Sequence, residues 1–161
     1  MGRPTSRREF LRAAASAALM GPALVGPALM FRAAPARATP VEMREAITRL
    51  IGSASVHQGR VKIELPPLSE NGHAVPLTLS VDSPMTEADH VKAIHVFTEK
   101  NPQPDVVSFR FGPRAGRAHV ATRMRLADTQ TVVAVCELSD GSFWSASATV
   151  LVTLAACVEE L

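Results

Sequence analysis

Short β-rich runs separated by turn residues fill the chain from residue 61 to residue 154. The spacers contain Pro, Gly, Asn and Asp, the residues that tight turns require. About seven strands at this spacing predict an all-β fold, an immunoglobulin-like β-sandwich. The predicted strands are Val61–Leu65, Val75–Val81, Val91–Thr98, Val106–Phe111, Ala118–Leu126, Thr131–Leu138 and Phe143–Leu154.

One short helix is predicted before these strands. Thr39 and Pro40 are suited to cap and start it, because Thr accepts a hydrogen bond from a helix N-terminal N–H and Pro fits the first turn. Gly52 is a natural stop. The apolar residues between these ends recur at helical spacing: Val41, Ile47, Leu50 and Ile51.

The last two runs form a predicted hairpin. A two-residue turn at Asp140 and Gly141 would pair Cys136 with Ser145 across it. Along the final run, Trp144 and the following even-numbered apolar residues share one face, while Ser and Thr residues share the other. The partner run 131–138 is apolar on both faces, so it is either central and covered or part of a subunit interface.

The N-terminus has the features of a twin-arginine export signal. The pattern Ser6–Arg12 contains Arg7 and Arg8, and an apolar stretch with Gly and Pro breakers follows to Phe31. Ala36–Ala38 then gives a small-x-small cleavage pattern. These features predict a signal over residues 1–38 and a folded, exported protein in the periplasm; an uncleaved N-terminal anchor is the alternative.

Removing residues 1–38 changes the charge of the protein. That segment holds six of the 17 basic residues and one of the 15 acidic ones, which leaves a mature chain near −3. A basic footprint for nucleic acid is therefore absent, and we expect no nucleic-acid partner. No later stretch is long enough to span a bilayer, so we expect no membrane association after cleavage.

Two cysteines, Cys136 and Cys157, follow the predicted signal. A disulfide between them is one interpretation in an oxidising compartment, and a tail that folds back would permit it. The hairpin argues against the bridge, because Cys157 lies roughly 40 Å along an extended strand from the position opposite Cys136. If no disulfide forms, we expect Cys136 to be a buried apolar residue. Cys157, near the C-terminus, is then an accessible thiol.

Other chemical groups give weaker signals. His90 and His95, five residues apart, are expected on opposite faces of a strand, and the remaining histidines are isolated, so we expect no metal and no other cofactor. No nucleophile-elbow pattern occurs, although a Ser-His-Asp triad stays open as an alternative.

Arg123 and Arg125 share a predicted strand face. They form either a solvated edge or a docking point for an anion or an acidic partner.

Six segments, taken in order, resemble the SoxY family, and together they span nearly all of the chain after the signal. Each motif is weak alone, while the order and spacing are more specific. The segments are Pro76–Met85, Asp89–Ile94, Asn101–Pro104, Thr122–Ala127, Asp140–Trp144 and Ala148–Thr153.

The resemblance implies a sulfur carrier of the thiosulfate-oxidising Sox system rather than an enzyme. SoxY proteins have an immunoglobulin-like fold and form a heterodimer with SoxZ, so a SoxZ-like subunit is the implied partner. Their C-terminal cysteine, within Gly-Gly-Cys-Gly-Gly, carries intermediates into periplasmic sulfur-oxidising enzymes, including a c-type cytochrome. The matching residue here is Cys157, the implied site of covalent sulfur attachment.

The C-terminal arm, residues 155–161, departs from that family pattern. Cys157 follows two alanines and precedes Val158, Glu159, Glu160 and Leu161, which add bulk and charge. Three outcomes stay open: carriage with adapted enzymes, service in another periplasmic oxidation system, or loss of carriage. The rival to a carrier is therefore a non-catalytic sandwich module, residues 39–154, whose role is binding or structural.

Overall fold

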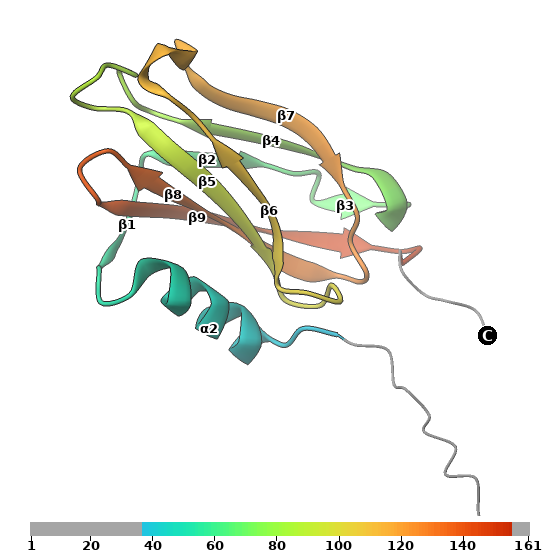
Figure 1. Ribbon diagram of the computed structural model, residues 1–161. Coiled ribbons are helices and arrows are strands. Elements are labelled where there is room, and N and C mark those ends of the chain that lie inside the picture. Colours follow the sequence, from blue (N-terminus) through green and yellow to red (C-terminus); the bar gives the residue numbers. More distant parts are fainter. Residues whose placement is uncertain (1–36, 156–161) are drawn as a thin grey trace, which may run out of the picture. The chain divides into compact units, whose positions relative to one another are not determined.

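The computed structural model describes residues 37–155, which form a two-layered β-sandwich with one α-helix (Figure 1). The larger sheet has the strand order β1-β9-β8-β5-β6, with the short β3 also paired to β9; the smaller has the order β2-β4-β7. The strands are β1 (Val56–Gln58), β2 (Val61–Glu64), β3 (Leu68–Ser69), β4 (Val75–Val81), β5 (Val91–Thr98), β6 (Asp105–Arg110), β7 (Ala118–Met124), β8 (Gln130–Leu138) and β9 (Phe143–Val152).

This architecture confirms the predicted immunoglobulin-like sandwich with a short N-terminal helix. All seven predicted strands are present, and β1 and β3 are additional short strands that run parallel to β9. Two 3₁₀ turns, η1 (Gly72–Ala74) and η2 (Pro113–Ala115), connect strands. Within residues 37–155, no helix has the length and apolar character needed to cross a membrane.

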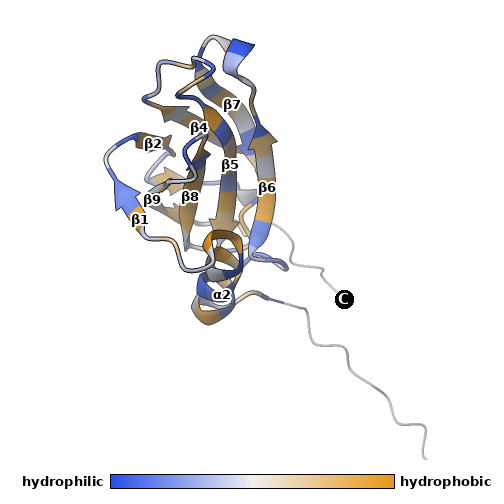
Figure 2. Ribbon diagram, turned by 60° about the vertical axis from the view of Figure 1, so that its left-hand side comes forward, coloured by the Kyte–Doolittle hydropathy of each residue, from blue (hydrophilic) through white to orange (hydrophobic). Residues whose placement is uncertain are grey.

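The main core lies between the two sheets. Along β4 every second residue is buried, so Leu77 and Leu79 point inward while Thr78 and Ser80 point outward. Ile94 and Val132 meet them from the larger sheet and are fully buried. Figure 2 shows the hydrophobic residues concentrated along these facing strands.

The helix α2 (Pro40–Ile51) covers the other face of the larger sheet. A capping box begins it: the Glu42 N–H donates to Thr39 Oγ1 at 3.2 Å, and the Thr39 N–H donates to Glu42 Oε2 at 2.8 Å. Its buried Met43 packs in a second cluster with Phe97 and Val135. The predicted helix, with its cap and its stop at residue 52, is confirmed.

Strand β8 is apolar on both faces because both faces are covered. Cys136 belongs to the core between the sheets, whereas Val135 belongs to the cluster under α2. Of the two alternatives for this strand, a central, covered position is therefore confirmed. Its neighbours β9 and β5 lie on either side of it in the sheet.

The hairpin β8–β9 corrects one prediction. Cys136 lies opposite Trp144, not opposite Ser145. The loop has three residues, because Leu138 N–H donates to the Ser142 carbonyl at 3.0 Å and Gly141 has φ 82°. A shift of one residue in the pairing of β8 and β9 changes which face of β9 lies beside the core face of β8. The observed register aligns the apolar face of β9 with the core face of β8.

Candidate functional site

The predicted attachment residue, Cys157, and the predicted signal up to residue 36 lie outside the described residues. The described chain nevertheless includes the base of the C-terminal arm, up to Ala155. The candidate site comprises the residues that hold this base, the second cysteine, and the polar side chains that the fold brings together.

The main chain leaving β9 is fixed by hydrogen bonds through Leu154. The Thr153 N–H donates to the Ser69 carbonyl at 3.1 Å, and its Oγ1 donates to the Glu70 carbonyl at 3.2 Å. The Gly72 N–H donates to the Leu154 carbonyl at 2.8 Å. The segment from β3 to η1 thus forms a seat for the last residues before the arm.

The seat has an apolar outer surface. Leu68 and Leu151 are register partners in the β3–β9 pair and are each about half exposed. Leu154, three residues after Leu151, is 61% exposed. Large apolar side chains exposed in a group are unusual on a protein that works alone.

Cys136 is the only cysteine among residues 37–155, and it is fully buried. Burial raises the pKa of its thiol to about 12, and the nearby Glu137 carboxylate adds to the shift. The thiolate is the reactive form of cysteine. Cys136 is therefore the buried apolar residue that the sequence indicated, and its thiol is unsuited to nucleophilic chemistry.

The histidines do not converge. His90, just before β5, donates from Nδ1 to the Thr86 carbonyl at 3.0 Å, while His95 lies in mid-strand with its Nδ1 2.7 Å from Ser108 Oγ. In the part of the chain that the structure describes, no three His, Cys, Asp or Glu side chains are grouped to bind a metal.

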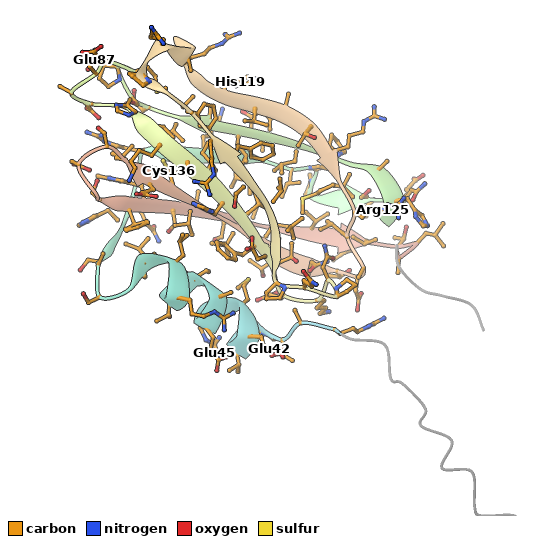
Figure 3. The ribbon with its side chains drawn as sticks, viewed as in Figure 1. Glu42, Glu45, Glu87, His119, Arg125 and Cys136 are labelled. Atoms are coloured by element: carbon orange, nitrogen blue, oxygen red, sulfur yellow. The ribbon has the colours of Figure 1, made fainter. Side chains whose placement is uncertain are left out.

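The two arginines singled out in the sequence are both exposed, and Figure 3 shows Arg125 at the end of the sandwich away from Cys136. Arg123 is in β7, but Arg125 lies one residue past its end, so the two do not share a strand face as predicted. The next residue, Leu126, donates its N–H to Gly72, which also holds Leu154. Arg125 therefore immediately precedes a residue that is hydrogen-bonded to the seat of the arm.

A groove between α2 and β6 was not predictable from the sequence. It has a volume of about 520 Å³, and its charged lining residues are Arg49 from the helix and Asp105 and Arg110 from the strand. His95 also lines it. These residues are far apart in sequence and follow no motif, so only the fold brings them together.

Comparisons with known proteins identify the family. The model of the family described as sulfur oxidation protein SoxY matches residues 47–157, more than half of the chain and including Cys157. The structure of the sulfur carrier protein SoxY from Chlorobium limicola f thiosulfatophilum is similar, with a TM-score of 0.59 and 31% identity over 71% of this chain and 98% of that one.

A superoxide reductase (neelaredoxin) from Ignicoccus hospitalis is also similar, with a TM-score of 0.54 and 16% identity over 60% of this chain and 94% of that one. At this identity the likeness concerns the fold alone. No match was found among curated protein sequences. The family match and the similarity to the SoxY structure agree with the observed sandwich, and the chain belongs to the SoxY family of sulfur oxidation proteins.

Proposed function

We propose that this protein is a periplasmic sulfur carrier that holds thiosulfate-derived intermediates covalently on Cys157 and is not itself an enzyme. The observation that carries the proposal is that the SoxY match extends through Cys157, while the main chain is anchored up to Leu154. The arm therefore begins at a fixed point three residues before the thiol.

That fixed point defines how far the thiol extends. Three residues span at most about 11 Å when fully extended. A cysteine on such a short tether stays close to the sandwich. Enzymes that act on the thiol must therefore dock on the end of the sandwich around Leu154, where Leu68 and Leu151 offer exposed apolar surface.

The same geometry argues against the disulfide alternative. Cys136 lies opposite Trp144, and β9 continues for eight residues to Val152, about 27 Å. Five further residues to Cys157 span at most about 18 Å. An intact β9 thus leaves the two cysteines farther apart than the roughly 5.5 Å between Cα atoms that a disulfide requires.

The chemistry proceeds in two balanced steps. The Cys157 thiolate and thiosulfate join through a new S–S bond and release two electrons, which a c-type cytochrome accepts. Water then cleaves the bond between the terminal sulfonate and its neighbouring sulfur, releasing sulfate and two protons and leaving a persulfide on Cys157. Both steps need the thiol to enter a partner enzyme.

The implied partners follow from the family. A SoxZ-like subunit forms the heterodimer, and periplasmic sulfur-oxidising enzymes, including the cytochrome, act on the loaded arm. The twin-arginine pattern supports export of a folded or preassembled protein. The residues after the thiol, Val158 to Leu161, favour the alternative, a SoxY-like binding or structural module that has lost sulfur carriage.

Intact-mass measurement tests the proposal. The mature protein is purified without reductant from cells grown on thiosulfate, alongside Cys157→Ser and Cys136→Ala. Sulfur or thiosulfate increments should appear in the native protein and in Cys136→Ala, disappear with reductant, and be absent from Cys157→Ser. An unmodified mass in all three proteins would favour the non-carrier alternative, and a native mass two hydrogens low would indicate the disulfide.

A further inference from the structure

The groove between α2 and β6 has a basic end. Along the β5–β6 register, Asp105 is opposite Phe97, Ser108 is opposite His95, and Arg110 is opposite Ala93. The carboxylate and the guanidinium of β6 are therefore at opposite ends of the groove, with the histidine between them.

The helix adds a second cation at this end. The Ala38 N–H donates to the Asn101 carbonyl at 2.8 Å, so α2 begins near the β5–β6 loop, at the Asp105 end. Arg49, in the last turn of α2, thus lies toward Arg110. Within residues 37–155, the only ion pairs are formed by other side chains, which leaves both guanidinium groups available.

His95 lies between these charges with an unused ring nitrogen. Its side chain is only 9% exposed, and its Nε2 is buried without a hydrogen-bond partner in the described structure. Buried polar groups in folded proteins almost always have a partner, because leaving one unpaired is costly. Because His95 also lines the groove, its Nε2 is a polar group at the groove wall that has no partner among the described residues.

We propose that the basic end of this groove binds a small divalent oxyanion of the sulfate and thiosulfate class. Arg49 and Arg110 supply charge-assisted hydrogen bonds from two sides. With Ser108 donating its hydroxyl proton to Nδ1, His95 keeps its proton on Nε2 and offers a third donor. The apolar wall, which includes Phe97 and Leu50, limits competition from water and strengthens these contacts.

This inference does not depend on Cys157 or on the proposed function. The groove is lined only by α2, β5, β6 and the loop before β6, and none of these elements forms the seat of the C-terminal arm. A protein that has lost sulfur carriage would still bind the anion. Conversely, failure of anion binding would leave covalent carriage on Cys157 untouched.

The test uses the mature chain with Cys157→Ser, so that no covalent adduct forms. Sodium sulfate and sodium thiosulfate are titrated at constant ionic strength against sodium chloride, and binding is followed by NMR of the His95 ring and by calorimetry. Arg49→Gln and Arg110→Gln should each weaken sulfate binding about tenfold, the order expected for losing a charged hydrogen bond. Arg123→Gln, an exposed arginine on the other sheet, should bind sulfate normally.

The ring of His95 gives an independent readout. Desolvation lowers its pKa, nearby Asp105 and Glu137 raise it, and Arg110 lowers it further; Arg49 faces the groove from α2. Bound sulfate should shift that pKa upward in the parent protein and in Arg123→Gln, but less in Arg49→Gln and Arg110→Gln. No saturable sulfate binding, or equal weakening in all three arginine variants, would overturn the inference.

Discussion

At the scale of single residues, the two cysteines of this chain are placed under different physical constraints. Cys136 is enclosed by the core between the sheets, where burial raises the pKa of its thiol to about 12. The proposed carrier, Cys157, follows the last anchored residue by three positions. Cys136 is thus protected from thiol chemistry by protonation and burial, which leaves Cys157 as the thiol of the proposed sulfur carriage.

The raised pKa of Cys136 predicts an alkaline loss of stability. Above pH 9 the unfolded chain releases this proton while the folded chain retains it until about pH 12, so the free energy of unfolding falls as pH rises through that window. The loss from this group is at most about 1.4 kcal/mol per pH unit. Urea unfolding at pH 8 and pH 10 measures it.

Cys136→Val is the matched variant, because Val is apolar and carries no proton. The native protein should lose more stability than this variant between the two pH values, and titration of Cys157 is common to both. Equal losses would contradict a strongly raised thiol pKa at position 136.

At the scale of elements, the end of β9 depends on a clamp from the loop before β8. The Val152 N–H donates to Thr129 Oγ1 at 2.9 Å, and the same hydroxyl is 3.4 Å from the Val152 carbonyl. One side chain therefore serves both main-chain groups of the last residue in the strand. It acts just before the seat that holds Thr153 and Leu154.

Thr129→Val should release this end of the strand. Loss of the hydroxyl leaves the Val152 N–H without its partner and should lower the free energy of unfolding by about 1 kcal/mol. Hydrogen exchange at Val152 and Thr153 should accelerate, while the amides of β4 are unaffected. Thr131→Val, a change of the same kind on β8, is the control and should leave exchange at Val152 unchanged.

The strands themselves were largely predictable, because turn residues bound them and apolar residues fill them. Two short strands, β1 and β3, were not predictable. They have three and two residues, and both are defined by parallel pairing with β9 rather than by a pattern of their own. The hairpin loop was one residue longer than predicted. Gly141 is compatible with either loop, and the choice depends on which register aligns the two apolar faces.

At the scale of the whole molecule, the proposed carriage requires the sandwich and its arm to fit partner enzymes together. We predict that the tail after the thiol restricts which enzymes accept the arm. Replacing Ala155 and Ala156 with glycine, and residues 158–161 with two glycines, removes bulk and two carboxylates that are costly to desolvate. Sox enzymes adapted to glycine-flanked arms should load this variant at least about tenfold faster than the native chain.

The loading rate is measured from the thiosulfate adduct in intact-mass spectra, with the same glycine arm carrying Cys157→Ser as the blank. Equal rates for the native and glycine arms would mean that the tail does not determine acceptance. Enzymes from this protein's own system, tested in parallel, should load the native chain.

The groove illustrates what the sequence does not reveal at this scale. Arg49, His95 and Arg110 belong to a helix and two strands, and their spacing in the chain matches no motif. A β-bulge in the β5–β6 pair, between Val96 and Phe97, also sets which β6 residues face α2. By contrast, the choice of Cys157 as the attachment site rests on its position in a family pattern, and it stays a prediction.

The capped start of α2 has a consequence for maturation. Ala38 is buried and Arg37 is 3.8 Å from Asp128, so the bond expected to be cut during export joins a packed residue to the cap of a helix. A protease that needs an extended substrate must wait for this segment to open, and processing of a folded precursor is therefore governed by local fraying. A cut at the predicted site would make Thr39 a chain terminus, and its contact with Glu42 would change from an amide hydrogen bond to an ammonium–carboxylate pair.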